Sequence, residues 1–202
     1  MRPDPSASPW LIAMAASAGG IPALKTVLES LPPTIPASVV IVLHHVAKPE
    51  STLEGILAPD TRMLITTAKA GDCIQLGVVY IARPDHHLVV KPDRRFAYID
   101  GARIQFVLSS ANPLFDSAAQ VFGDRTIAVV LAGDGFDGKD GIHLINARGG
   151  VVIAQDPASA AHPSMPASAV STGVVDYVLP LEAIAPALNA IALGRPVESQ
   201  SV

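Results

Sequence analysis

Aliphatic runs of strand length recur along this chain and alternate with segments that have the composition of helices. Residues 10–16, 38–43 and 126–132 are almost entirely apolar and rich in small and branched side chains. Strands of this kind are buried on both faces, as in parallel sheets covered by helices. The alternation therefore predicts an α/β fold, with a doubly wound, mostly parallel sheet, helices on both faces and right-handed crossovers. Ligands of such sheets bind at the carboxyl ends of the strands.

The two ends of the chain and its middle differ from this pattern. Residues 1–9 are rich in Pro and Ser and are expected to be disordered, residues 10–193 form one domain, and residues 194–202 are a frayed tail. Between residues 64 and 99, short extended runs are separated by Gly-Asp and Pro-Asp turns, which predict an antiparallel hairpin insert. The predicted strands cover 10–16, 38–44, 64–67, 78–82, 87–90, 96–99, 126–132, 151–155 and 176–179. The predicted helices cover 21–31, 50–57, 113–122, 138–148, 166–172 and 181–193.

Composition narrows the class of protein. Half of the 202 residues are apolar, which provides ample material for a core, and the net charge is −4. The basic residues do not cluster, so a nucleic-acid partner has little support. One cysteine, Cys73, excludes an internal disulfide and fits a reducing compartment. No apolar run approaches the length of a membrane span, and Asp4 with several prolines argues against a signal peptide. We therefore expect a cytoplasmic protein without direct membrane insertion.

Ser17 follows the first apolar run and precedes two glycines and a helical segment. A strand, a tight turn of small residues and a helix can expose a nucleophilic hydroxyl beside free backbone N–H groups. Two alternatives stand beside this interpretation. Ser17 could be a helix N-cap. The segment could also bind a phosphate, although neither G-x-G-x-x-G nor G-K-[ST] is present.

His44 and His45 end the second apolar run, where a polar side chain is unexpected for core filling. Adjacent strand residues point to opposite faces, so only one of them can face Ser17 as a general base. The doubled histidines, with His86 and His87, also permit a metal site. No Cys, Asp or Glu stands near them at ligand spacing, and we predict no metal.

Asp137 lies in a glycine-rich loop after a third apolar run, together with Asp134 and Asp140. A carboxylate there could orient an imidazole, which completes a Ser17–His44–Asp137 triad hypothesis. Calcium binding is disfavoured because the acidic spacing is three and not two. The remaining alternative is a helix N-cap.

Five motifs in order resemble the chemotaxis protein-glutamate methylesterase family, over about residues 10–193. ASAGG at 16–20 resembles its nucleophile motif, and VLH at 42–44 resembles its V-Q-H motif. VVYIARPDHHL at 78–88 is similar to Y-I-A-P-x-D-x-H-L, and LAGDGFDG at 131–138 resembles L-T-G-M-G-x-D-G. AQDP at 154–157, followed by SMPASA at 164–169, resembles the closing signature. The resemblance selects His44 as the base, not His45.

The resemblance implies hydrolysis of glutamate γ-methyl esters on the cytoplasmic helical bundle of chemoreceptors. Methanol is released, and some glutamines are deamidated. Ser17 would attack, His44 would transfer the proton and Asp137 would orient His44. Backbone amides near Ala18 and Asp134 would form the oxyanion hole. No cofactor is implied, and the other residues expected to contact substrate are Gly19, Gly20 and Met165.

Three departures from the family pattern bear on function. VLSSAN at 107–112 replaces a basic segment of the active-site rim, which leaves substrate choice open. Asp134 replaces a methionine of the oxyanion loop and Phe136 a small or polar residue; a carboxylate aimed at an oxyanion would raise the barrier. No receiver domain precedes the catalytic domain, so we expect any regulation to come from a protein in trans. The alternatives are an esterase of the same fold with another substrate, and a catalytically weak binding or regulatory module.

Overall fold

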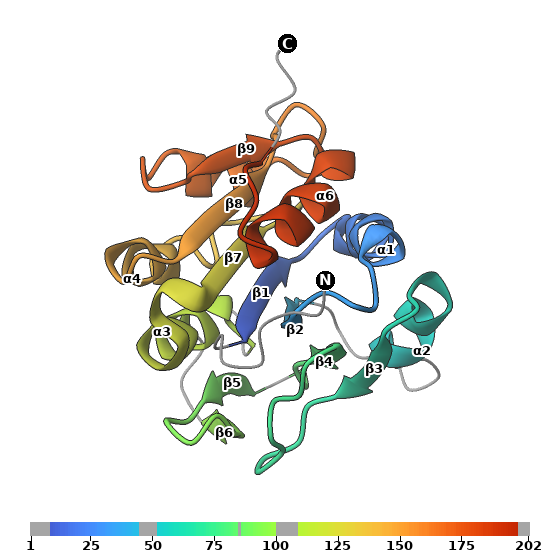
Figure 1. Ribbon diagram of the computed structural model, residues 1–202. Helices are drawn as coiled ribbons and strands as arrows, with labels where there is room; N and C mark the ends of the chain where they lie inside the picture. Colours follow the sequence, from blue (N-terminus) through green and yellow to red (C-terminus); the bar gives the residue numbers. More distant parts are fainter. Residues whose placement is uncertain (1–8, 45–51, 85, 100–108, 198–202) are drawn as a thin grey trace.

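The computed structural model describes residues 9–44, 52–84, 86–99 and 109–197, and its centre is a parallel sheet (Figure 1). Seven strands pair in the order β3-β4-β2-β1-β7-β8-β9, and every neighbouring pair is parallel. The strands are β1 (Trp10–Ala16), β2 (Ala37–Leu43), β3 (Leu64–Thr67), β4 (Val78–Ile81), β7 (Thr126–Val130), β8 (Val151–Gln155) and β9 (Tyr177–Leu179). The helices are α1 (Gly20–Ser30), α2 (Leu53–Leu57), α3 (Ala111–Phe122), α4 (Gly141–Ala147), α5 (Ser164–Val170) and α6 (Leu181–Ala192). The predicted doubly wound α/β fold is confirmed.

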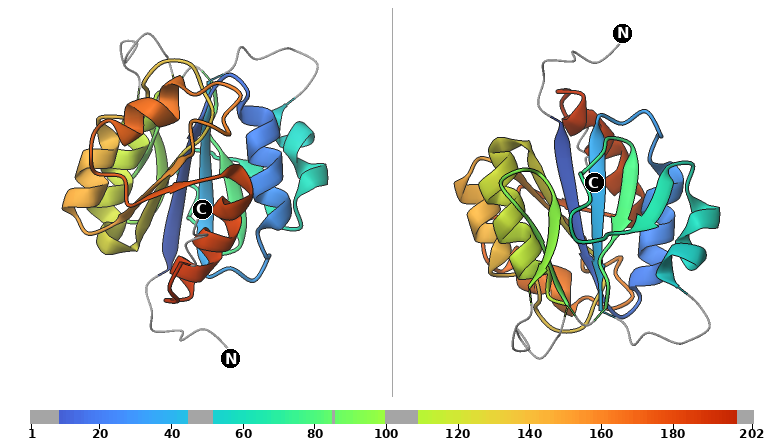
Figure 2. Two further views of the ribbon diagram at one scale, coloured as in Figure 1. Left: turned by 90° about the horizontal axis from the view of Figure 1, so that it is seen from above. Right: turned by 90° about the horizontal axis from the view of Figure 1, so that it is seen from below.

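Alternate residues of β1 explain why the sheet is covered on both faces. Ile12 and Met14 point into a core shared with α1, α2 and α6, whereas Leu11 and Ala13 point into a core shared with α3, α4 and α5 (Figure 2). All four side chains are fully buried. Burial of one large aliphatic side chain contributes about 1.5–3 kcal/mol, so the two cores together hold β1 rigidly in the middle of the sheet.

The predicted hairpin insert is confirmed for two of its four runs. β5 (His87–Val90) and β6 (Phe96–Ile99) form a separate antiparallel pair that packs on α3. The prediction is wrong for β3 and β4, which extend the main sheet as parallel strands beyond β2. Their connection runs out to the hairpin and back: Gly71 N–H donates to Phe96 O, and Phe96 N–H donates to Asp72 O. The Gly-Asp signal therefore marks a turn of this excursion and not a turn between two antiparallel strands.

Several element ends shift by a few residues. α2 begins after Thr52, whose hydroxyl accepts from Gly55 N–H, and α3 begins two residues before the predicted start. The segments predicted as disordered at 1–8 and frayed at 198–202 lie outside the described residues. The described part of the tail is held to α6 by a hydrogen bond from Arg195 N–H to Ala190 O. Among the residues that the structure describes, no helix has the length and apolar character needed to cross a lipid bilayer.

Candidate active site

Ser17 directly follows β1, at the turn into α1. Its backbone N–H donates to Ala132 O at 3.0 Å, and its carbonyl accepts from Gly20 N–H at 2.8 Å. Gly19 occupies the N-cap position with a φ of +71°, a left-handed conformation that side chains disfavour. No side chain caps α1. The Ser17 hydroxyl is therefore not used as a helix cap, which removes the plainest alternative to a nucleophile.

His44 lies beside Ser17 because β1 and β2 are parallel and in register. Ala16 pairs with Leu43, and His44 N–H donates to Ala16 O at 3.0 Å. Ser17 and His44, the residues that follow these two strands, are thus neighbours at about the 4.8 Å strand spacing. The structure describes no hydrogen bond between the Ser17 hydroxyl and the His44 ring. Such bonds are often long before substrate binds and tighten in the complex. His45 lies outside the described residues.

Asp137 reaches the His44 ring from the loop between β7 and α4. Oδ2 of Asp137 lies 2.7 Å from Nε2 of His44, and both side chains are largely buried. Nδ1 is therefore the ring nitrogen left for Ser17. The structure brings the three predicted residues together at the carboxyl ends of β1, β2 and β7. This is the arrangement that general-base activation of a serine requires.

The Asp137 carboxylate accepts hydrogen bonds from two donors besides its contact with His44. Ser110 Oγ donates to Oδ1, and Ala111 N–H donates to Oδ2 at 2.7 Å. Burial by itself raises the pKa of Asp137, but the contact with His44 and the hydrogen bonds from Ser110 and Ala111 outweigh it and hold the pKa below its usual value. Asp137 is therefore ionised at neutral pH and can stabilise a protonated His44 during proton transfer.

Sequence reasoning missed two residues that support Asp137. Ser110 caps α3 by accepting from Asn112 N–H, and its own N–H donates to Nδ1 of His87 at 3.1 Å. Both Ser110 and His87 are buried. Ser110 lies three residues before the predicted helix start at residue 113, and a serine close to a helix start was the available signal for the cap. Its second bond, to Asp137 on a loop 27 residues away, has no local signature.

The residues expected to contact substrate divide into two groups. Within the described residues, no acceptor is bonded to the backbone N–H groups of Ala18, Gly19 or Asp134. Those amides are free to donate, and the assignment of Ala18 and Asp134 to an oxyanion hole stays a prediction. Gly20 and Met165 are buried. They pack under the site rather than line its surface.

Packing explains why Gly20 and Gly133 are glycines. A methyl group added at Gly20 would lie 2.7 Å from Cβ of Ala16, and one added at Gly133 would lie 2.8 Å from Cβ of Ser17. The built position at Gly133 also overlaps the Met165 sulfur. Gly133 therefore lets the loop after β7 approach Ser17 closely, which brings the neighbouring Asp134 to the site.

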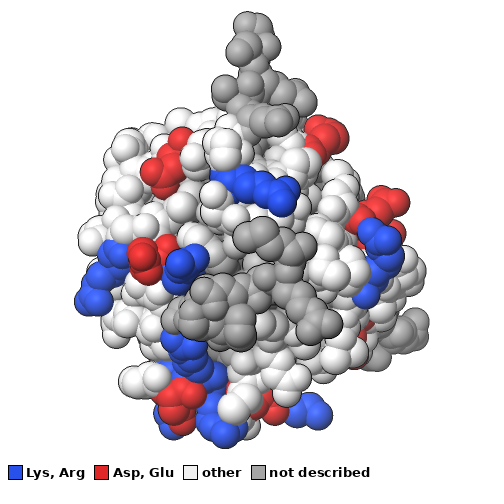
Figure 3. Space-filling view, in the orientation of Figure 1, with Lys and Arg blue, Asp and Glu red and all other residues white. Residues whose placement is uncertain are grey.

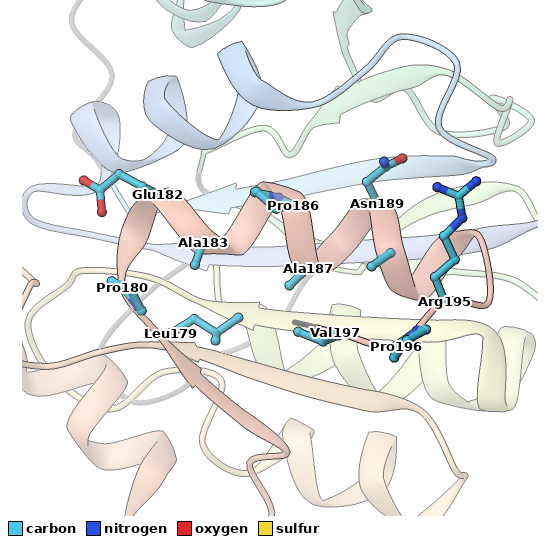
Figure 4. A pocket seen from close by; sticks show the side chains of 11 residues that line it. Leu179, Pro180, Glu182, Ala183, Pro186, Ala187, Asn189, Arg195, Pro196 and Val197 are labelled. Atoms are coloured by element: carbon cyan, nitrogen blue, oxygen red, sulfur yellow. The ribbon is translucent and has the colours of Figure 1, made fainter. Parts of the chain in front are cut away.

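Other surfaces of the described chain offer less chemistry. No three His, Cys, Asp or Glu side chains among the described residues converge as metal ligands would. On the face shown in Figure 3, Lys and Arg lie interspersed with Asp and Glu and form no continuous basic surface. A cavity of about 670 Å³ opens beside α6, but Glu182 and Arg195 lie at opposite ends of that helix and far from each other (Figure 4). None of the triad residues lines it.

Comparison with known proteins gives concordant matches. A family model described as CheB methylesterase matches residues 12–188. A protein of Leptospira interrogans named putative protein-glutamate methylesterase/protein-glutamine glutaminase is 38% identical over 174 residues, which cover 86% of this chain and 90% of that protein. A Rhizobium meliloti protein, named protein-glutamate methylesterase/protein-glutamine glutaminase of group 3 operon, is 35% identical over 92% of this chain. The match spans only 52% of the Rhizobium protein.

A solved structure agrees with these sequence matches. The crystal structure of the Thermotoga maritima CheB methylesterase catalytic domain superposes with a TM-score of 0.87 and 31% identity. The superposition covers 92% of this chain and 100% of the other.

Proposed function

This chain belongs to the CheB methylesterase family, and from that premise we propose that it hydrolyses glutamate γ-methyl esters on the cytoplasmic helical bundle of chemoreceptors. The observation that carries the proposal is the register of β1 and β2, which sets Ser17 beside His44, with Asp137 2.7 Å from the His44 ring. Deamidation of receptor glutamines would use the same groups, with ammonia as the leaving group in place of methanol.

In the proposed reaction, Ser17 Oγ attacks the ester carbonyl and His44 accepts the hydroxyl proton. The tetrahedral intermediate then collapses, the C–O bond to the methoxy group breaks, and His44 returns the proton so that methanol leaves. Water, deprotonated by His44, hydrolyses the resulting acyl-enzyme and restores Ser17. His44 accepts the proton in its neutral form.

The free amides of Ala18 and Asp134 are the proposed oxyanion hole. Donors aimed at the developing oxyanion stabilise the transition state more than the substrate, and loss of one such donor costs about a hundredfold or more in kcat. Gly19 keeps the chain close to the reacting carbonyl. Phe136, nearly half exposed in the same loop as Asp134 and Asp137, offers an apolar contact at the rim for a helical substrate.

The partners and location follow from this substrate. The chain would act in the cytoplasm, where the methylated receptor helices lie. A second candidate is an esterase of the same fold with another ester substrate. The VLSSAN sequence favours it, because it stands where the family's basic rim segment would be.

The test is methanol release from a methyl-labelled receptor cytoplasmic fragment. Wild type and Ser30→Ala, a change at an exposed serine at the end of α1, should release methanol, and Ser17→Ala should not. A fluorophosphonate probe should label wild type and leave Ser17→Ala unlabelled. Labelling without methanol release would favour another ester, and absence of both in folded wild type would contradict any hydrolase.

A further inference from the structure

The carboxylate of Asp134 contacts a histidine, His162, from another loop. Its Oδ1 lies 3.1 Å from Nδ1 of His162, in the loop between β8 and α5. An ionised carboxylate can only accept, so Nδ1 of His162 carries a hydrogen and the Nδ1–H group donates a hydrogen bond to Asp134. Both side chains are substantially exposed, 66% for Asp134 and 43% for His162, so little else fixes the carboxylate's direction.

This pair stands directly beside the proposed oxyanion amides. A methyl group added at Gly19 would lie 3.1 Å from Cδ2 of His162, so the imidazole ring packs on the Gly19 backbone. Asp134 itself follows Gly133, which approaches Ser17. The contact with His162 is therefore what fixes the position of the Asp134 carboxylate beside these amides.

We propose that His162 is a positioning residue whose hydrogen bond fixes the Asp134 carboxylate and limits its repulsion of the oxyanion formed at Ser17. The inference rests on the proposed hydrolase function. A negative charge near a developing oxyanion opposes the stabilisation that the Ala18 and Asp134 amides provide. The bond to His162 offsets part of the charge of the Asp134 side chain, while Asp134 supplies its backbone N–H to the oxyanion.

The side-chain bond is not needed to join the two loops. Gly133 N–H donates to His162 O at 2.9 Å, and Met165 N–H donates to Gly133 O at 2.9 Å. These backbone bonds persist when the His162 side chain is truncated. Removal of the imidazole should therefore change the electrostatics of the site more than its architecture.

The test is a double-mutant cycle on His162 and Asp134, read as kcat and KM for methanol release from methylated receptor fragment. His162→Ala should lower kcat by about three- to tenfold with little change in KM or Tm. The same change in an Asp134→Asn background should lower kcat by less than about twofold, because no charge remains to be held. His162→Asn, which keeps a donor, should retain more kcat than His162→Ala. His143→Ala, at an exposed histidine of α4, is the matched control.

Equal losses from His162→Ala in both backgrounds would overturn the inference, because a structural role does not depend on the Asp134 charge. So would wild-type kcat in His162→Ala, and methanol release by wild type would then leave the proposed function standing. The rate of fluorophosphonate labelling of Ser17 gives a second readout that does not depend on the receptor. A wild type that neither labels nor releases methanol would overturn the function and the inference together.

Discussion

At the scale of single residues, the hydrogen-bond donors around Asp137 help to fix the orientation of the His44 ring. Asp137 receives donors from Ser110 and Ala111 while it contacts the His44 ring, so one buried carboxylate links α3 to the end of β2. Because every partner of Asp137 favours its ionised form over burial's opposing effect, its pKa stays low. The base is thus oriented by a charge that persists at neutral pH.

The first prediction concerns the choice between the two adjacent histidines. His44→Ala should lower kcat by about 10³-fold or more, because general-base activation of Ser17 is lost. His45→Ala should cost less than about tenfold, since it is the His44 ring that Asp137 contacts. Steady-state methanol release from folded variants measures both. Equally severe losses in the two would contradict the assignment of His44.

The second prediction concerns Ser110. Ser110→Ala removes a hydrogen bond to a buried charge, worth about 1.5–3 kcal/mol. We expect about a tenfold loss of kcat with KM little changed, and a lower free energy of unfolding by urea. Ser109→Ala is the control, at a buried neighbour that is not among the hydrogen-bond donors to Asp137, and should retain activity. A Ser110→Ala variant with wild-type kcat would show that the hydrogen bond from Ser110 is not needed to keep Asp137 in place.

Residues that follow strand ends could be predicted, and residues that act across loops could not. Ser17, His44 and Asp137 each stand just after an aliphatic run, where a polar side chain has few structural reasons to be. Ser110 and His162 lie in stretches with no such contrast. Their partners are 27 and 28 residues away, and only the folded loops bring them together.

At the scale of elements, the long aliphatic strands were predictable and the short ones were placed in the wrong sheet. β1 and β2 each have seven residues with continuous apolar character, which specifies burial on both faces. β3 and β4 have four residues each. Runs so short carry no signal for parallel against antiparallel pairing. The excursion of residues 68–77 to the hairpin, which separates them, depends on contacts with Phe96 and Arg94.

The third prediction tests how Asp137 ties the β7–α4 loop to α3. Its folded pKa is lowered below the unfolded value of about 3.9, so its ionised form stabilises the fold above that pH. Asp137→Asn should lower the free energy of unfolding by about 1–3 kcal/mol at neutral pH. The difference should shrink as pH falls below about 4, toward the folded pKa, because wild type also loses the charge.

Urea unfolding across that pH range measures this difference. Asp93→Asn, which removes an exposed carboxylate, is the control and should change the free energy of unfolding little at any pH. A deficit in Asp137→Asn that stayed constant through acid pH would show that it comes from packing and not from charge.

At the scale of the whole molecule, both cores lie against one seven-stranded sheet, and the separate hairpin of β5 and β6 packs into one of these cores. Leu88 and Phe96 of the hairpin are fully buried in the same cluster as Leu11 of β1 and Leu114 of α3. The opposite face of β1 contributes Ile12 to the other cluster. β1 contributes side chains to both cores. Loss of the helices from either face would therefore expose a strand that also supports the core on the other face.

The last prediction is that the domain unfolds in one cooperative transition. Trp10, the only tryptophan, begins β1 and stacks under Arg125, so its fluorescence reports on the centre of the sheet. Cys73, exposed and the only cysteine, pairs with the hairpin at Arg95, so a fluorophore there reports on that layer. In urea, both signals and the far-UV circular dichroism should share one midpoint, as a two-state domain requires. An earlier transition at Cys73 would show that the hairpin layer opens on its own. The hairpin could then rearrange without unfolding of the main sheet that carries the triad.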